Sequence, residues 1–336
     1  MAQPRFQSAY SRICLLGAIA LTIVALVIYL TLSRGTALQE QRATLLNTES
    51  IRELTAAFDR LHFDLHAVRV GRQAVPRVYV VTLPEDLSET ADIALRKSAF
   101  LRSLLPLVLM ANEELREKRE RVAWTIKKRD RGQSLTKSEQ AWLAATIDLY
   151  GAGGDLDLLE RVDLLPAALV LAQGIEESGW GRSRFAQEGN ALFGQRIWGP
   201  GASGLDPQNA EDEEKFRVRS FEDLMASVRS YMHNLNSHPA YERFRAFRAA
   251  RRRDGVPLRA EDVLTALDGY SEEAALYRER LTAIIRGNRL EDFRDAQLAS
   301  VERSGRGALA ALWKKTPAPV ALPKGQETPS RFERRQ

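Results

Sequence analysis

Cysteine is almost absent from this chain of 336 residues, and the single one, Cys14, lies within a long apolar run near the N-terminus. Disulfides, cysteine-ligated zinc sites and cysteine nucleophiles are therefore excluded from the rest of the chain. Histidine is also scarce. His62 and His66 have the spacing of a metal-binding pair on a helix, but Phe63 stands where a zinc protease helix carries its glutamate. We interpret both histidines as solvated, and we expect neither a metal nor a cofactor.

A net positive charge is missing from most of the chain, although the formal net charge of the whole is +5. Residues 298–336 hold eight Lys or Arg against three Glu, which accounts for the whole excess. The remainder is close to neutral, so we expect no nucleic-acid-binding surface. The same segment ends in a proline-rich stretch with few large apolar residues, which predicts a disordered basic tail over residues 297–336. Its charge suits anionic polymers or lipid head groups, or it is simply solvated.

One apolar run, Ile13 to Ser33, contains no charged residue. Its roughly 21 residues match a bilayer core about 30 Å thick. Arg5 and Arg12 precede the run, so the positive-inside rule places the N-terminus in the cytoplasm and the rest of the chain outside. A cleaved secretory signal is the alternative, although the run is long for a signal and lacks a clear A-x-A cleavage site. We predict a cytoplasmic stub and transmembrane anchor over residues 1–34.

The segment that follows the anchor alternates charges with leucines at helical spacing. Residues 36–65 suit an exposed helix or a short coiled-coil stalk, and a short β-branched segment comes after them. We therefore predict a stalk or linker over residues 35–82.

Helical patterns dominate from Leu87 onward. Residues 91–120 carry apolar residues at helical spacing, and Pro106 should kink or interrupt that helix. Another helix should begin at a capping box, with Thr136 as the cap and Glu139 three residues later. The pattern alone predicts a mainly α fold.

The stretch with the most chemical information begins at Pro166. Pro166 suits the first turn of a helix, and Gly179 suits the left-handed residue that ends one, so a helix should run from Pro166 to about Ser178. Residues 167–175 carry only Gln173 as a polar side chain, which predicts burial on nearly every side.

Glu176 and Glu177 stand in the last turn of this helix. The negative end of the helix macrodipole and an apolar wall both disfavour a charged carboxylate there, so we expect a raised pKa. A carboxyl that is still protonated near neutral pH is what general-acid cleavage of a glycosidic bond requires. The two side chains point roughly 100° apart on a helix, so both cannot face the same bond.

The string LAQGIEESGWGRS (171–183), followed by NALFG (190–194), resembles the catalytic core of the bacterial mannosyl-glycoprotein endo-β-N-acetylglucosaminidase (glucosaminidase) family, and its Bax-protein branch most. In that family the catalytic glutamate directly precedes S-G-W-G, which is Glu177 in this chain. Gly269-Tyr270 resembles the family's G-Y pair, whose tyrosine lines the active cleft. The resemblance extends to the segments LPEDL (83–87), RKSAFLRSLLPLVLMANEEL (96–115), LLERVDLLPAALVLAQ (158–173), SYMHNLNSHPAYERFR (230–245) and LDGYSEEAALYRERLTAIIRGNRL (267–290).

This resemblance implies a lysozyme-like α+β domain over residues 83–296, with a catalytic core at about 158–290. A second catalytic carboxylate is not evident, because the T-T-E-Y string that carries it in much of the family is absent. The acids at 211–214 are substitutes by position only, and a charge run is usually a solvated face. The N-acetyl carbonyl of the substrate could act as nucleophile instead, with Tyr270 orienting or stabilising the developing charge.

Candidates for substrate binding are residues whose rings can stack on a pyranose or whose polar groups can bond to it. The alternative is structural: Trp180 and Phe193 could wedge the helix end against the following loop, and Tyr231 could pack in the core. Tyr277, about two helical turns after Tyr270, is interpreted as a packing residue. The substrate-binding candidates are Trp180, Asn190, Phe193, Trp198, Tyr231 and Tyr241.

The resemblance implies a hydrolase that cuts the N-acetylglucosaminyl-β-1,4-N-acetylmuramic acid bond in peptidoglycan strands. With the anchor, it would be a single-pass protein of the bacterial inner membrane with a periplasmic catalytic domain. Two alternatives stay open: a lytic transglycosylase, and a non-catalytic wall-binding or scaffold protein. The string N-A-L-F-G, instead of a G-L-M-Q type string, disfavours the first, and the intact Glu177 with its S-G-W-G disfavours the second.

Overall fold

The computed structural model describes residues 43–198, 203–207, 216–267 and 272–300. The described part is mainly helical, as the sequence pattern predicts. Both the predicted anchor, residues 1–34, and the predicted tail beyond Ser300 lie outside the described residues. Within the described ranges, no helix has the length and apolar character needed to cross a membrane.

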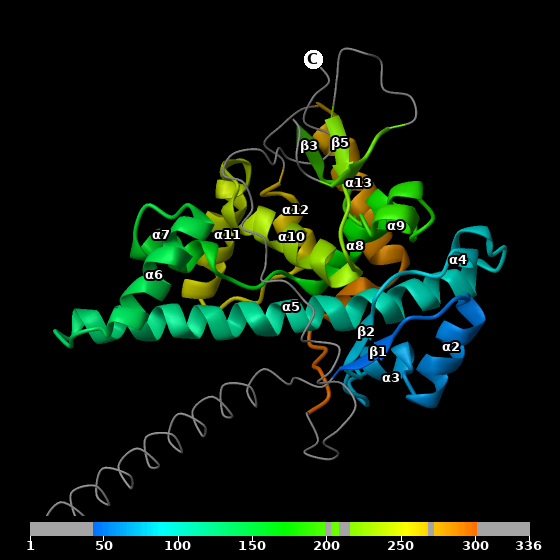
Figure 1. Ribbon diagram of the computed structural model, residues 1–336, viewed down its shortest axis with the longest axis horizontal. Helices are drawn as coiled ribbons and strands as arrows, with labels where there is room; N and C mark the ends of the chain where they lie inside the picture. Colours follow the sequence, from blue (N-terminus) through cyan, green and yellow to red (C-terminus); the bar gives the residue numbers. More distant parts are fainter. Residues whose placement is uncertain (1–42, 199–202, 208–215, 268–271, 301–336) are drawn as a thin grey trace, which may run out of the picture. The chain divides into compact units, whose positions relative to one another are not determined.

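The longest helix, α5 (Ile93–Asp130), crosses the domain, with α2 (Ile51–Arg60) and α3 (Leu65–Arg69) on one side and α8 (Ala167–Ser178) and α10 (Leu224–Ser237) on the other (Figure 1). The side chain of Asp92 caps its start by accepting a hydrogen bond from the Leu95 N–H at 2.9 Å. The helix passes through Pro106 without interruption and continues ten residues beyond the predicted end. A proline inside a helix removes one backbone hydrogen bond. Its turn is buried on all sides, with Leu104, Leu105 and Leu107 at most 1% exposed, so packing holds the helix together there.

The prediction of a stalk over residues 35–82 is wrong for its described part, which packs into the core. Leu54 and Phe58 of α2 are fully buried, and α2 packs against α5. The leucine spacing therefore marks an amphipathic helix whose apolar face α5 covers. The elements of this segment are β1 (Thr44–Leu46), α2 (Ile51–Arg60), α3 (Leu65–Arg69) and β2 (Val78–Val80), with β1 and β2 paired in parallel.

A smaller hydrophobic cluster covers the C-terminal half of α5, where α6 (Lys137–Tyr150) and α7 (Asp155–Arg161) pack. The capping box at Thr136 is present as predicted, and Gly151 ends α6 in the left-handed conformation. Figure 1 shows α6 and α7 at one end of α5, with α2, α3 and the parallel strand pair toward the other.

The helix with the two acids, α8 (Ala167–Ser178), follows Pro166 and ends before Gly179, as predicted. It is buried from Ala167 to Ile175. Helix α8 contacts α5, α12 (Ala260–Leu264), α13 (Glu272–Gly287) and the short 3-10 helix η2 (Leu290–Phe293).

Several short elements surround the C-terminal end of α8. The glycine- and proline-rich region after the NALFG string contributes to a three-stranded antiparallel sheet in the order β3-β5-β4. Helix α10 ends before His238-Pro239. The remaining elements are α4 (Asp86–Glu89), α9 (Arg184–Gly189), β3 (Arg196–Trp198), β4 (Gly204–Leu205), β5 (Phe216–Arg219), α10 (Leu224–Ser237), η1 (Pro239–Tyr241) and α11 (Glu242–Arg253).

The end of the described chain also belongs to the domain. Val75 donates its N–H to the Gln297 carbonyl at 2.7 Å and accepts from the Ala299 N–H at 2.8 Å. The predicted domain end at residue 296 and tail start at residue 297 are therefore early by at least three residues, because this backbone pairing ties residues 297–299 to the N-terminal segment.

Candidate active site

Glu177 lies in the last turn of α8. Its side chain is half-buried and lies close to helix α13 and to the Gly194 backbone. Its Oε1 accepts a hydrogen bond from the Tyr277 hydroxyl of α13 at 3.1 Å. On the other side, a Cβ added to Gly194 would lie 3.6 Å from Oε2, and Gly194 has φ +59°. The left-handed glycine that ends the NALFG string thus brings bare backbone next to the carboxylate.

The adjacent acid has a different environment. Glu176 accepts a hydrogen bond from Arg280 Nε at 2.6 Å, and both side chains are partly buried. Tyr277 and Arg280 are three residues apart on one helix, so α13 supplies a neutral partner to Glu177 and a cationic partner to Glu176. This division follows the expectation that the two acids face different directions.

A chain of hydrogen bonds runs from Glu177 back into the core. Gln173 Nε2 donates to the Tyr277 hydroxyl at 3.1 Å, and the Tyr231 hydroxyl donates to Gln173 Oε1. Burial raises the pKa of Tyr231 and of Tyr277 well above the usual range, and the charge of Glu177 contributes in the same direction. Both tyrosines therefore remain protonated near neutral pH, and the Tyr277 hydroxyl can donate to Glu177.

Sequence reasoning missed this relay. Tyr277 does pack against the hydrophobic core, as interpreted from the sequence, but its hydroxyl also contacts Glu177, which the sequence did not indicate. The signal that could have found the relay is Gln173: a polar side chain in a buried helix must find hydrogen-bond partners, and it lies one turn before Glu177.

The S-G-W-G string forms a tight reversal directly after Glu177. Gly179, Trp180 and Gly181 all have positive φ, at +57°, +64° and +77°. Ser178 Oγ accepts the Gly181 N–H at 2.9 Å and so closes the turn. A Cβ on Gly181 would lie 2.5 Å from Leu83 Cδ1, so only glycine fits at that position. The string thus reverses the chain directly after α8, so Glu177 lies where the helix meets this turn.

Comparison with known proteins agrees with these motifs. The family model described as mannosyl-glycoprotein endo-beta-N-acetylglucosaminidase matches residues 156–290. "Protein bax" of Escherichia coli (strain K12) is 33% identical over 201 residues, which cover 57% of this chain and 70% of that protein. The chain belongs to the glucosaminidase family. The catalytic domain of the autolysin Auto from Listeria monocytogenes, a crystal structure, aligns at a TM-score of 0.31 and 17% identity over 50% of this chain and 96% of that domain.

The glucosaminidase match contains every residue of the Glu177 relay. It begins in α7 and ends at the first residue of η2, close to the predicted core of residues 158–290. The N-terminal segment with α2, and most of α5, lie before the matched residues.

Three of the aromatic candidates pack near Glu177 or against the core around it. Phe193 is 2% exposed and stacks on Tyr231, with ring centroids 4.0 Å apart. Trp180 is half-buried, meets Phe100 edge-on at 5.8 Å and has the Lys97 ammonium 4.8 Å from its ring centroid. These contacts favour the structural alternative, in which Trp180 and Phe193 wedge the end of α8 against its surroundings and Tyr231 belongs to the core.

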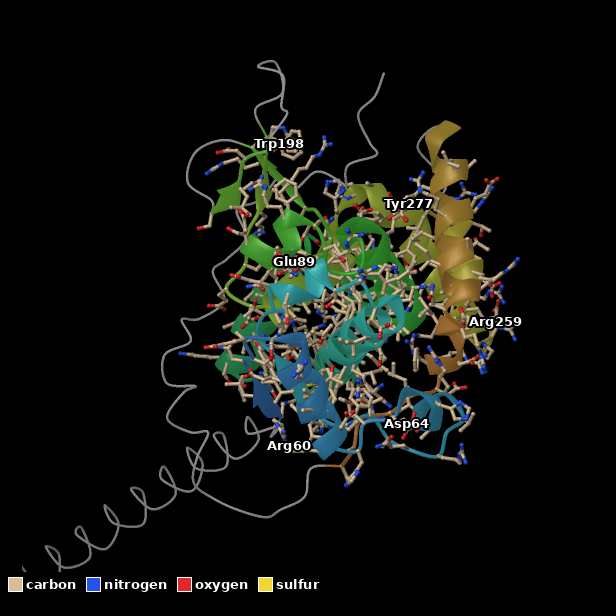
Figure 2. The ribbon with its side chains drawn as sticks, turned by 90° about the vertical axis from the view of Figure 1, so that its right-hand side faces the viewer. Arg60, Asp64, Glu89, Trp198, Arg259 and Tyr277 are labelled. Carbon is tan, nitrogen blue, oxygen red and sulfur yellow. The ribbon has the colours of Figure 1, made fainter. Side chains whose placement is uncertain are left out.

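The other candidates lie at more open positions. Asn190 ends α9 with φ +52°, and its Nδ2 donates to the Phe221 carbonyl at 3.2 Å. Tyr241, in η1, is partly buried. Trp198, on β3, is partly exposed and lies tilted against Phe216 at 6.3 Å. Figure 2 shows Trp198 and Tyr277 toward the same end of the domain, opposite Arg60 and Asp64.

Tyr270 and the acids at 211–214 lie outside the described residues. Among the residues that are described, no group of three or more His, Cys, Asp or Glu side chains is placed to hold a metal ion. The described part of the site therefore includes the Glu177 carboxyl, the hydrogen-bonded Tyr277, Gln173 and Tyr231 side chains, and the Gly194 backbone.

Proposed function

We propose that this protein is a membrane-anchored peptidoglycan hydrolase that cleaves the N-acetylglucosaminyl-β-1,4-N-acetylmuramic acid bond, with Glu177 as the general acid. The observation that carries the proposal is the different pairing of two adjacent acids. Glu176 is committed to an ion pair with Arg280, whereas Glu177 meets the neutral hydroxyl of Tyr277. A carboxyl with a neutral partner at the end of an apolar helix can hold a proton and deliver it.

In this mechanism Glu177 protonates the glycosidic oxygen as the bond breaks. Tyr277 holds the carboxyl in place through its hydrogen bond, and Gln173 holds Tyr277. The N-acetyl carbonyl of the sugar acts as the internal nucleophile, and Tyr270 orients it or stabilises the charge that develops. Membership of a family described as endo-β-N-acetylglucosaminidases supports this bond type. The lysozyme-like arrangement that the resemblance implies is part of the same proposal.

Product chemistry tests the proposal directly. Purified peptidoglycan would be digested with the full-length protein, with Glu177→Gln as the matched inactive variant, and the fragments analysed by mass spectrometry. The proposal requires a reducing-end N-acetylglucosamine that the variant does not release. A 1,6-anhydro ring would assign the protein to the lytic transglycosylases instead. An absence of cleavage by folded parental protein would favour the wall-binding alternative.

The proposed location follows from the predicted span at residues 13–33 and the arginines before it. The inner membrane would hold this segment, and the catalytic domain would lie in the periplasm. A reporter that works only in the cytoplasm, fused after Gln336, should then be inactive. An active reporter would reverse the proposed topology.

A further inference from the structure

Trp124 is an exposed tryptophan in the second half of α5. Its side chain is 55% exposed, and it is the one aromatic residue among the large apolar side chains that are exposed in the described part of the chain. The apolar contacts of this half of α5 come from other positions, since Val122 and Ile126 are buried in the cluster with α6 and α7. Packing therefore does not account for Trp124, and an exposed indole ring indicates a binding role.

Two cations on α5 are held beside tryptophan rings. The Lys128 ammonium lies 5.0 Å from the centroid of the Trp124 ring and 2.8 Å from Glu139 Oε2 of α6. The Arg121 guanidinium lies 3.9 Å from the centroid of the Trp142 ring, also on α6. Residues three and four apart on a helix are neighbours, so Arg121 and Lys128 flank Trp124 on one face of α5.

The cations on this face extend to the end of α5. Helical spacing aligns residues 121, 124, 127, 128 and 131 in one stripe. The stripe therefore holds four cations and one tryptophan, and Glu139 balances one of the cations. The acids Glu117 and Glu120 continue the stripe on the side toward the middle of α5. We call the following residues the Trp124 surface: Arg121, Trp124, Lys127, Lys128, Arg131 and Trp142.

Arg121 is the cation of this surface that is best placed for a ligand. It is exposed, and apart from its ring contact it makes no hydrogen bond or ion pair with another residue that the structure describes. A guanidinium stacked on an aromatic ring keeps its N–H donors free in its own plane. Trp142 therefore holds Arg121 in place while its donors stay open to an anion.

The chemistry of the surface identifies the kind of occupant. The neighbours of Trp124 on its face are charged instead of apolar, which disfavours a membrane or the apolar core of a protein interface. A pyranose ring can stack on the indole, and a carboxylate on the same sugar can accept hydrogen bonds from Arg121. Side chains three residues apart on a helix have Cβ atoms about 5–6 Å apart, so one sugar can contact both.

We infer that the Trp124 surface binds peptidoglycan glycan strands at N-acetylmuramic acid residues whose carboxylate carries no peptide. Trp124 stacks on the sugar ring, and Arg121 binds the carboxylate. The inference rests on peptidoglycan as the proposed substrate and adds a second binding site for it.

The Trp124 surface is separate from the candidate active site. The last part of α8 lies against α5 at Leu104, because a Cβ on Gly174 would lie 2.9 Å from Leu104 Cδ2. Trp124 comes 20 residues after Leu104 on the same helix, which is about 30 Å along its axis. It also precedes the residues that the glucosaminidase model matches. Only a long strand can therefore occupy both sites, whereas short fragments can reach the active site alone.

The test measures binding by the full-length protein in an uncharged detergent, with Glu177→Gln in every variant so that strands stay intact. The ligands are glycan strands freed of stem peptides, the same strands with their peptides, and chitin oligosaccharides, whose N-acetylated sugars have no carboxylate. The surface variant is Trp124→Ala with Arg121→Gln. Its matched control, Val70→Ala with Arg52→Gln, changes one exposed apolar residue and one exposed arginine in the N-terminal segment.

Peptide-free strands should bind the control as tightly as the unsubstituted surface. The surface variant should bind them at least about tenfold more weakly, because it loses a ring contact and a charge-assisted bond. Its midpoint of thermal unfolding should match that of the control; should the double variant not fold, Arg121→Gln alone repeats the measurement. Equal binding by the surface variant and the control would overturn the inference.

The other ligands test the carboxylate. Chitin oligosaccharides should bind more weakly than peptide-free strands and should not distinguish the surface variant from the control. Chitin binding as tight as strand binding would overturn the inference. So would tighter binding of the peptide-bearing strands through Arg121 and Trp124. A single-stranded DNA oligonucleotide that competes equally well would assign the surface to polyanions in general and overturn the sugar.

Cleavage with Glu177 restored separates this inference from the proposed function. The surface variant should cleave short glycan fragments at the parental rate and long peptide-free strands more slowly, at strand concentrations below saturation. If the parent binds strands through the Trp124 surface but cleaves nothing, the proposed hydrolase fails and the binding site stands. If the parent cleaves and the surface variant matches it in both binding and rate, the binding site fails and the hydrolase stands.

Discussion

Charged side chains lie at both ends of α8, each of the sign that the helix macrodipole disfavours. Different neighbouring groups stabilise the charges at the two ends. At the C-terminal end two acids lie at the negative end of the macrodipole, and at the N-terminal end arginines gather at the positive end. At the acid end the Tyr277 hydroxyl donates to Glu177 and the Gln173 amide donates to Tyr277. At the basic end the arginines bond to the buried carboxylate of Asp163 and to backbone carbonyls.

This difference fits the proposed role of Glu177 as a general acid. A group that must take up and release a proton is best held by neutral donors, because a charged partner would commit it to one protonation state. Arginines stay charged throughout, so the basic end can be a permanent electrostatic cluster. Four substitutions test the proposed contrast between a catalytic end and a structural end of α8.

The largest expected effect is on catalysis. Glu177→Gln is nearly isosteric but cannot donate a carboxylic proton, so the rate of peptidoglycan cleavage should fall by at least about 10²-fold to 10⁴-fold. Glu176→Gln, the matched control, should keep most of the activity. Release of soluble fragments from purified peptidoglycan measures both. A folded Glu177→Gln protein that cleaves at the parental rate would end the proposal and leave the scaffold alternative.

At the basic end we expect a loss of stability instead. Asp163→Asn removes the one carboxylate among three guanidinium groups, and leaving buried charges without a partner costs about 3–5 kcal/mol. Asp262→Asn breaks a partly exposed pair with Arg251 and should cost at most about 1 kcal/mol. Urea unfolding gives both values. Similar losses for the two variants would show that Asp163 is not the centre of the cluster.

The relay should show a smaller effect, visible in the pH dependence. Tyr277→Phe removes the hydroxyl that donates to Glu177 and should lower the cleavage rate about tenfold, the equivalent of about 1.4 kcal/mol. A carboxylate that loses a donor is harder to ionise, so the limb of the pH-rate profile that reports Glu177 should move to higher pH.

Tyr79→Phe is the control for the relay, because Tyr79 also donates to a carboxylate, Asp223 Oδ2 at 2.8 Å, but takes no part in the relay. Its pH-rate profile should match that of the parent. If Tyr277→Phe also leaves the profile in place, Tyr277 does not position Glu177.

The smallest effect should come from Trp198. We expect Trp198→Ala to weaken glycan binding by up to about tenfold, since one aromatic contact is worth about 0.5–1.5 kcal/mol. The midpoint of thermal unfolding should hardly change, because the ring is partly exposed. Trp180→Ala, by contrast, should destabilise the fold through its lost contact with Phe100. A large loss of stability in Trp198→Ala would assign that ring to the core.

Local chemistry explains why some elements were predictable. Pro166 and Gly179 locate α8 to within one residue at each end, and Thr136 with Glu139 locates the start of α6. Proline, left-handed glycine and a capping box act within one turn of chain, so their effect can be recognised without the rest of the fold.

Other predictions failed because the same sequence pattern is compatible with several structures. The leucine spacing around Leu54 suits a solvated stalk or a helix packed on a core, and only the contact with α5 distinguishes them. Pro106 was expected to disturb a helix whose turn is in fact held on every side by buried leucines. In both cases distant residues outweighed the local preference.

The sequence by itself determined the ends of α8, the place of Glu177 beside a left-handed turn, and the membership of the glucosaminidase family. These properties depend on neighbouring residues or on a contiguous motif. Only the tertiary structure decided which acid is paired with Arg280, which tyrosine reaches Glu177 and which arginines gather around Asp163. Those partners lie between 44 and 104 residues away along the chain, as Asp163–Arg119 and Glu176–Arg280 show. Hydrogen bonds and ion pairs act over a few ångströms in space, so the folding of the chain, and no local pattern, brings such groups together.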